Sequence, residues 1–278
     1  MIKSILIPTD GSPNSNISLE YGIYLALKFK AEITGLNVVD IRKLEGPFFS
    51  DISGALGFSP YQNYVQKFQE ILEERGNIII KDLEKICIEK SIHPKTKRLT
   101  GIIPNIIADE GKKVDLIIIA QRGEYARWSS GLLGSTTESV VRKSLRPVLV
   151  TPVAFRPFET ILHACDGSDE SNKALKLACE IALSMNTKLK LVTITDKKEK
   201  GRKILDAAEE FIGPYHLDFD LELLNGESGE KILHYVIKHN VDLIVMGAFG
   251  HSRIHELILG GTTAYVIRKS TVPILLNR

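Results

Sequence analysis

Short runs of Ile, Val and Leu alternate along the chain with longer segments in which hydrophobic residues recur every three or four positions. The short runs predict buried β-strands, and the longer segments predict amphipathic α-helices. The first half is expected to hold strands near 2–8, 32–39, 95–99, 115–120 and 147–151, and helices near 14–29, 62–91, 103–112 and 136–144. The second half is expected to hold strands near 160–165, 188–195, 217–224, 242–247 and 272–276, and helices near 169–185, 199–211, 229–239 and 262–269.

This alternation predicts an α/β fold, because strands that are apolar throughout are typical of parallel sheets covered by helices on both faces. Such sheets bind ligands beyond the carboxyl ends of their strands, where the strand order switches. Functional residues are therefore expected just after the first, second and fourth strands of each half.

The chain also repeats itself. Residues 5–40 align without a gap with residues 161–196 at an offset of 156, whereas residues 114–120 align with 241–247 at an offset of 127. The first half therefore carries 29 additional residues, which we place near 41–70.

We expect two tandem doubly wound domains, one over residues 1–153 with the inserted loop and one over 157–278. The prolines at 152 and 157 predict a stiff connection between them.

The end of the first strand carries an aspartate in each half. The first half reads Pro8-Thr9-Asp10, and the second reads Ala164-Cys165-Asp166. A carboxylate at this position can accept hydrogen bonds from ribose hydroxyls or an adenine amino group. In the alternative interpretation the aspartate only stabilises the turn, while the serine two residues later caps the next helix. Both roles are compatible.

A glycine-rich loop follows the fourth strand of the second half and leads into a helix. Its candidate phosphate-binding residues are Gly247, Gly250, Gly260, Gly261, Thr262 and Thr263. Glycines let the backbone approach a polyphosphate, and the helix start adds unpaired N–H donors. The alternative is that the glycines only form tight turns.

The first half has a weaker version of this loop, in which Ala120 replaces the first glycine and ten residues, not nine, separate the second and third. Its candidate residues are Gly123, Gly134, Ser135 and Thr136. Arg122 and Arg127 are further candidates for phosphate contacts, although solvated surface charges are the more common role of arginine.

The spacing G-x2-G-x9-G-[ST] before a helix, together with P-x-D at the end of an early strand, resembles the ATP-binding universal stress protein family over nearly the whole chain. The resemblance implies a five-stranded parallel sheet of order 3-2-1-4-5 in each half. It further implies ATP as the ligand. Adenine would contact the backbone of Val38 and Ile194, and ribose would contact Asp10 and Asp166. In an enzymatic alternative on the same architecture, Asp10 or Asp166 would hold Mg²⁺.

Both halves depart from this pattern, because Gly261 stands where Ser or Thr is expected and Ala164 and Cys165 replace Pro and Thr. We rank the second half's phosphate loop above the first's, and Pro8–Asp10 above its counterpart. One, both or neither site could be occupied.

Other chemistries find less support. His251 and His255 lie four residues apart without a third ligand at suitable spacing, so no metal site is predicted. Walker, Rossmann and G-x-S-x-G motifs are absent from the sequence, so we identify no catalytic residue.

The net charge of +2 gives no indication of a nucleic-acid or membrane partner. Scattered cysteines and an N-terminus without a signal-peptide pattern favour a cytoplasmic protein with buried, reduced thiols.

The inserted segment is rich in aromatic residues, including Phe48, Phe49 and Phe58. We favour a lid over the first pocket or a partner surface, with packing beneath the long second helix as the alternative. The last strands, Pro147–Thr151 and Pro273–Leu276, are expected at sheet edges and could pair in an intramolecular pseudo-dimer. Homodimers are compatible with this arrangement.

The leading hypothesis is an ATP-binding stress-response protein that acts as a binding or signalling module. The alternatives are a slow ATPase or nucleotidyl-transfer enzyme, and an interaction protein whose nucleotide sites have decayed.

Overall fold

The computed structural model describes residues 2–42, 61–124, 133–248 and 259–278, with side chains from residue 66 onward in the second range. The strands are β1 (Ser4–Pro8), β2 (Glu32–Asp40), β3 (Lys95–Gly101), β4 (Leu116–Ala120), β5 (Val148–Thr151), β6 (Thr160–Ala164), β7 (Lys188–Ile194), β8 (Phe219–Leu224), β9 (Leu243–Gly247) and β10 (Ile274–Asn277). The helices are α1 (Pro13–Phe29), α4 (Tyr61–Glu89), α5 (Ile103–Gly111), α6 (Ser135–Lys143), α7 (Asp169–Met185), α8 (Lys198–Ile212), α9 (Ser228–Lys238) and α10 (Gly261–Lys269), with a 3₁₀ turn at Gly213–Tyr215.

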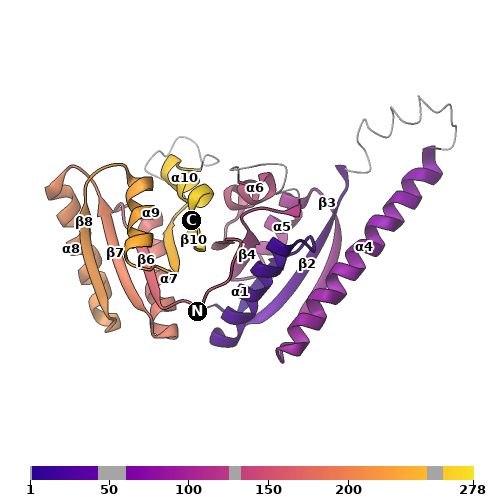
Figure 1. Ribbon diagram of the computed structural model, residues 1–278, viewed down its shortest axis with the longest axis horizontal. Helices are drawn as coiled ribbons and strands as arrows, with labels where there is room; N and C mark the ends of the chain where they lie inside the picture. The colour runs from indigo at the N-terminus through magenta and orange to yellow at the C-terminus, as the bar shows by residue number, and fades with distance from the viewer. Residues whose placement is uncertain (1, 43–60, 125–132, 249–258) are drawn as a thin grey trace.

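The strands form one sheet of order β3-β2-β1-β4-β5-β10-β9-β6-β7-β8 (Figure 1). Each half therefore has the expected order 3-2-1-4-5, and all neighbours within a half run parallel. The prediction of two doubly wound α/β units is confirmed.

The two halves meet at β5 and β10, which pair antiparallel with Val150 opposite Ile274 and Val148 opposite Leu276. The strands that the sequence places at sheet edges thus cover each other within the described structure. The main-chain groups on those edges are satisfied by this pairing, which removes two exposed edges.

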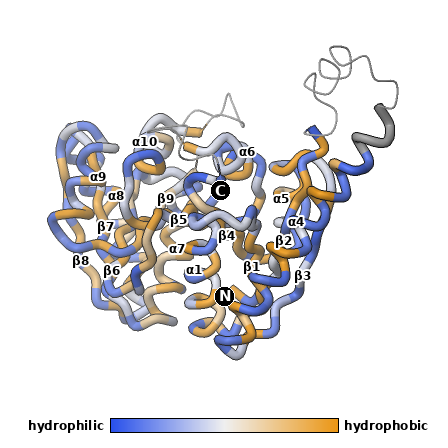
Figure 2. Tube along the Cα trace, turned by 45° about the vertical axis from the view of Figure 1, so that its right-hand side comes forward, coloured by the Kyte–Doolittle hydropathy of each residue, from blue (hydrophilic) through white to orange (hydrophobic). Residues whose placement is uncertain are grey.

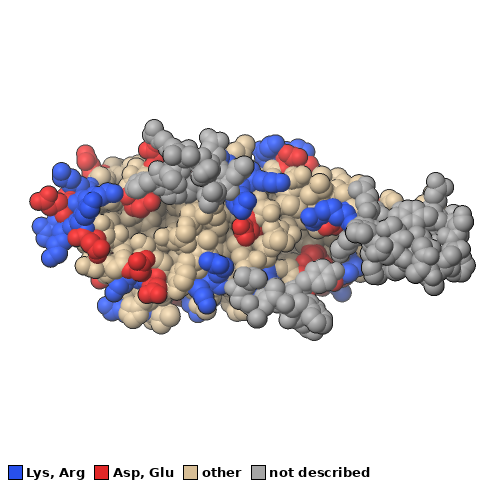
Figure 3. Space-filling view, turned by 90° about the horizontal axis from the view of Figure 1, so that it is seen from above, with Lys and Arg blue, Asp and Glu red and all other residues tan. Residues whose placement is uncertain are grey.

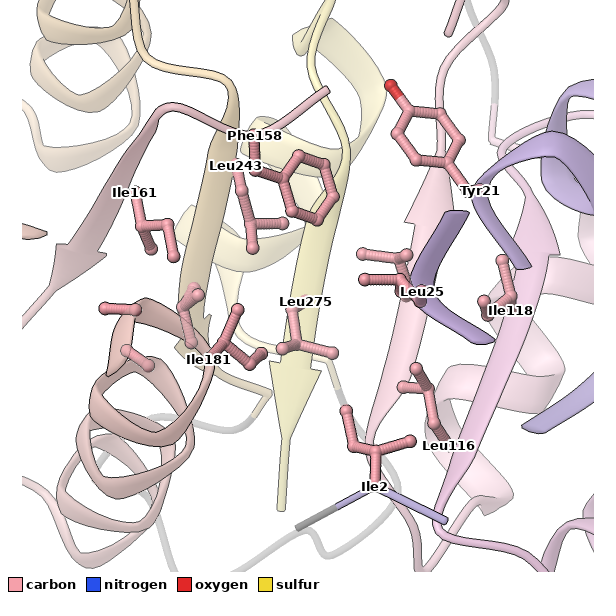
Figure 4. Packing of buried hydrophobic residues seen from close by; sticks show 14 of the residues in the cluster. Ile2, Tyr21, Leu25, Leu116, Ile118, Phe158, Ile161, Ile181, Leu243 and Leu275 are labelled. Carbon is pink, nitrogen blue, oxygen red and sulfur yellow. The ribbon is translucent and has the colours of Figure 1, made fainter. Parts of the chain in front are cut away.

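Helices cover both faces of the sheet, and each face has its own hydrophobic core. One core joins α1, α4, α7 and α8 to the sheet, and the other joins α5, α6, α9 and α10. Figure 2 shows hydrophobic residues concentrated in the strands and along the helix sides that face them. Both cores continue from one half into the other. In Figure 4, Ile181 and Leu275 of the second half lie in one cluster with Leu25 and Leu116 of the first.

The connection between the halves is held by two tyrosines of α1. The hydroxyl of Tyr21 donates to the carbonyl of Ala154 and accepts from the amide of Arg156, both at 3.2 Å. The amide of Phe158 donates to the hydroxyl of Tyr24 at 3.0 Å. Both tyrosine rings also pack against the Phe155 and Phe158 rings, so the connection is fixed by side chains as well as by its prolines.

The first half differs from the second mainly in α4, which is 29 residues long, whereas α8, its counterpart, has 15. Figure 1 shows α4 at the outer end of the first half, beside β3 and β2. The C-terminal part of the predicted insertion, 61–70, thus belongs to this helix. Residues 43–60, with Phe48, Phe49 and Phe58, lie outside the described residues, and with them the central part of the predicted lid.

Charged side chains of both signs lie among one another on the face seen in Figure 3. Cys87, Cys165 and Cys179 are buried and free. None of the helices in the described ranges combines the length and the apolar character needed to cross a membrane.

Candidate functional site

The turn after the first strand has the same geometry in both halves. The carboxylate of Asp10 accepts from the amide of Ser12 at 3.0 Å, and that of Asp166 accepts from the amide of Ser168 at 2.9 Å. Ser12 and Ser168 in turn cap α1 and α7 through their side-chain oxygens. Between Asp10 and Ser12, Gly11 adopts a φ of +75°. An added Cβ at Gly11 would lie 2.8 Å from the side chain of Ile79. The capping interpretation therefore holds for the serines, and glycine is required for the turn.

Asp10 has a second partner that Asp166 lacks among the described residues. The amide of Glu124, in the loop after β4, donates to Oδ2 of Asp10 at 2.8 Å. Burial of Asp10 acts to raise its pKa, but hydrogen bonds from Ser12 and Glu124 lower it, and the net pKa lies below its ordinary value. Asp10 is therefore an anion at neutral pH that retains acceptor capacity for hydroxyl groups.

A cavity of about 550 Å³ opens over the ends of β1, β2 and β4 in the first half. It brings together the residues that the sequence analysis proposed for this half, except Arg127, namely Pro8, Thr9, Asp10, Val38, Arg122, Gly123, Gly134, Ser135 and Thr136. Its volume lies within the range typical of small-molecule sites, about 300–1,000 Å³.

The helices that begin at the glycine loops differ from those that follow the first strands. α6 and α10 have glycine at the N-cap, Gly134 and Gly260, and no side chain caps either helix. Their first N–H groups consequently have no side-chain acceptor, whereas those of α1 and α7 do. An anion at these helix starts would satisfy them.

Arg122 marks the part of the first cavity that is suited to binding an anion. It lies between β4 and Gly123 and lines the cavity. Its Nε is buried and has no hydrogen-bond partner among the described residues. A buried guanidinium N–H without an acceptor is costly, so an anion bound beside it would be stabilised.

A second, smaller cavity of about 210 Å³ occupies the equivalent place in the other half. It brings together Asp166, Ile194, Gly247, Gly260, Gly261, Thr262 and Thr263. Gly250, the remaining residue proposed for this half, lies outside the described residues. The phosphate loop that the sequence ranks higher thus borders the smaller cavity.

The hydroxyl of Thr263 is already used in a hydrogen bond and is not a free donor for a ligand in this cavity. It donates to the carbonyl of Gly247 at 3.3 Å, just as Thr137 donates to Ala120 at 2.7 Å in the first half. These two threonines tie the start of a helix to the end of a strand. The hydroxyls of Ser135, Thr136 and Thr262, at the same helix starts, also line the cavities.

Sequence reasoning missed the part of the first cavity that α4 contributes through Leu72, Arg75, Gly76 and Ile79. It also missed Ile107 and Ile232, which line the two cavities from equivalent positions of α5 and α9. The internal repeat could have paired the isoleucines, but no motif points to α4.

His251, His255 and Arg127 lie outside the described residues. Within the described ranges, His, Cys, Asp and Glu side chains form no group of three or more that could hold a metal ion.

Comparison with known proteins shows that both halves match the same protein family. A family model described as "Universal stress protein family" matches residues 1–152 and 157–278. The universal stress protein Slr1230 of Synechocystis sp. is 30% identical over the full length of both chains. The universal stress protein MJ0531 of Methanocaldococcus jannaschii is 32% identical over 152 residues, covering 54% of this chain and 82% of that protein.

Among solved structures, the crystal structure of a universal stress protein from Archaeoglobus fulgidus matches with a TM-score of 0.77 and 24% identity. The match covers 99% of this chain and 96% of that one, and it supports the tandem fold.

Proposed function

Because the chain belongs to the universal stress protein family, with two tandem family domains, we propose that its first cavity binds an adenine nucleotide, ATP, in a stress-response role. Occupancy of this cavity would act as a signal, since the described residues around it offer positioned hydrogen-bond donors.

One observation carries this proposal: a single 550 Å³ cavity joins an ionised aspartate to an uncapped helix start and to an arginine whose buried Nε has no partner among the residues that the structure describes. These groups match the parts of a nucleotide. Asp10 would accept from the ribose hydroxyls, and the main chain of Val38 would contact the base.

The phosphates would lie against Gly123, Gly134, Ser135 and Thr136, with the guanidinium of Arg122 as their charged partner. Mg²⁺ would enter with the triphosphate and stay on its oxygens. The second cavity, at about 210 Å³, lies below the usual range of ligand sites, so we assign ATP to the first half.

The antiparallel pairing of β5 and β10 supports a further part of the proposal. We assign the two domains the arrangement of a pseudo-dimer within one chain, in which each domain covers the other's last strand.

The experiment is isothermal titration of the full chain with ATP, using Asp10→Ala and Asp166→Ala as a matched pair. We expect one ATP per chain, a loss of affinity of at least about tenfold in Asp10→Ala, and wild-type affinity in Asp166→Ala. Absence of binding to wild-type protein would overturn the proposal. A loss confined to Asp166→Ala would move the site to the second half.

Incubation with ATP and Mg²⁺, followed by measurement of ADP and AMP, separates the binding role from an enzymatic one. We expect no turnover above that of a heat-denatured sample.

A further inference from the structure

The two cavities are lined by corresponding positions of the internal repeat. Every residue that lines the second cavity occupies a repeat position that also lines the first: Asp166 corresponds to Asp10, Ile194 to Val38 and Ile232 to Ile107. The first cavity therefore contains the whole of the second as a shared part, and then continues further. The shared part includes Val38, Asp10 and the start of α6, to which we assign the base, the ribose and part of the phosphates of ATP. The remaining phosphate contacts, Arg122 and Gly123, line the first cavity only.

The continuation is a chamber on the α4 side of the sheet, lined by Asp40, Arg42, Leu72, Arg75, Gly76 and Ile79. Its α4 residues lie on the opposite sheet face from α5, whereas Asp40 and Arg42 line the cavity at the end of β2. Leu36 of β2 packs in the core beneath α5, whereas its neighbours Gly35 and Asn37 face Leu83 and Gly76 of α4. The first cavity thus passes over the ends of β1 and β2 from one face to the other.

Among the described residues, the second cavity is not lined by α8, and the chain leaves β7 differently from β2. Only Thr195–Lys197 separate β7 from α8, and α8 begins at this point. Both helices pack closely on the sheet at their glycine: an added Cβ at Gly201 would lie 2.3 Å from Leu223, and one at its counterpart Gly76 would lie 2.6 Å from Asn37. The two halves therefore differ in where the chain leaves the strand. In the first half, residues 41–60 separate β2 from α4. The position that corresponds to the start of α8 therefore lies well inside the longer helix α4.

The chamber's charges are already balanced among the described residues. Arg42 binds Asp40 through two hydrogen bonds of 2.9 and 2.8 Å, and Arg75 contacts Glu124 at 2.5 Å. A further phosphate here would face the carboxylates of Asp40 and Glu124. An uncharged, flat and hydroxylated group suits the chamber better, because guanidinium planes stack on heterocycles and the carboxylates accept from hydroxyls.

We propose that the α4-side chamber is a second nucleoside subsite, and that the first cavity therefore prefers ligands in which two nucleosides are joined by phosphates. One nucleoside occupies the shared part, the bridging phosphates lie on the α6 helix start and Arg122, and the other nucleoside enters the chamber past Glu124. This inference rests on the proposed function, since it takes the shared part to be the nucleotide site.

The test is isothermal titration of the full chain with ATP and, separately, with diadenosine tetraphosphate. We expect one diadenosine tetraphosphate per chain, bound at least about tenfold more tightly than ATP, a difference of about 1.4 kcal/mol. Leu72→Trp, which fills the chamber, should abolish this preference and leave the ATP affinity within about twofold. Ile71→Trp is the matched control, because Ile71 is 55% exposed on the same helix and does not line the cavity. It should keep the preference.

Equal affinities for the two ligands in wild-type protein, or a preference that survives Leu72→Trp, would overturn the second subsite and leave ATP binding intact. An equal loss of both ligands in Leu72→Trp, with an unchanged thermal unfolding curve, would also overturn it, because the chamber would then belong to the ATP site itself. If neither ligand binds to wild-type protein, the proposed function fails together with this inference.

Discussion

Glu124 donates its main-chain amide to Oδ2 of Asp10 at 2.8 Å, while its side chain contacts Arg75 of α4 at 2.5 Å. The glycine loop of the first half is thereby attached to both the candidate ribose-binding aspartate and the long helix. In the second half, Lys200 occupies the repeat position of Arg75.

Arg75→Gln tests how much the attachment to α4 contributes to ATP binding. The two side chains are 50% and 35% exposed, so solvent screens their ion pair and its contribution is at most about 1 kcal/mol. We expect ATP affinity to fall by no more than about fivefold, measured by isothermal titration, and Lys200→Gln to have no effect. A loss well beyond tenfold would contradict a purely positioning role and would indicate direct contact with ATP.

Arg122→Ala tests the proposed phosphate-binding part of the cavity. Charge-assisted hydrogen bonds contribute about 1.5–3 kcal/mol, so we expect a loss of ATP affinity of roughly ten- to a hundredfold. AMP should lose less, because fewer of its oxygens reach the loop. Arg142→Ala is the control, since that guanidinium pairs with Glu138 on the surface of α6. Unchanged ATP binding in Arg122→Ala would remove Arg122 from the site.

His163 gives the second half a specific pH dependence of stability. Burial lowers its pKa to about 4, with Nδ1 at 3.1 Å from the carbonyl of Val245. In the unfolded chain its pKa is about 6.5. Between these values only the unfolded state gains the proton, so stability falls as the pH drops below about 6.5.

The repeat position in the first half is Ile7, which suggests His163→Ile as the variant. Between pH 7 and pH 5 the free energy of unfolding should fall by about 2 kcal/mol less in this variant than in wild type. Urea denaturation at both pH values measures the difference. His93→Gln, at an exposed position, should retain the wild-type dependence, and parallel curves for wild type and His163→Ile would refute the assignment.

Tyr21→Phe tests the connection between the halves. The change leaves the carbonyl of Ala154 and the amide of Arg156 without the hydroxyl that joins them, so we expect a loss of about 1–2 kcal/mol in the free energy of unfolding. Tyr24→Phe removes one hydrogen bond and should cost less. Urea denaturation of both variants provides the comparison. A larger loss in Tyr24→Phe would contradict this assignment, because ring packing is the same in both variants and only the hydroxyl hydrogen bonds differ.

The elements of this fold could be predicted because the information for them is local. Buried strands need continuous apolar residues, and helices need an apolar stripe, so β4 and α7 can be recognised without knowledge of their neighbours. Ser12 and Ser168 act as N-caps through contacts only three residues away, which are equally local. The candidate residues at strand ends could be inferred because parallel strands bring their carboxyl ends to one edge.

The α4 wall of the first cavity could not be predicted in this way. Gly76 and Arg75 lie within a helix that looks ordinary in sequence, and their roles arise from contacts with Asn37 and Glu124. The relative size of the two cavities was likewise hidden. It depends on where the chain leaves β2 and β7, and on how closely the next helix then approaches the sheet.

The sequence by itself determined the internal repeat, the helices and strands, and the candidate residues that gather at the strand ends, because these follow from periodicity and from short-range turn and cap chemistry. The strand order was expected only from the family resemblance. Only the tertiary structure decided that β5 joins β10, that Glu124 reaches Asp10, and that the first cavity extends onto a second face of the sheet. Each of these depends on contacts between residues far apart in the chain, whose distances are set by the packing of whole elements.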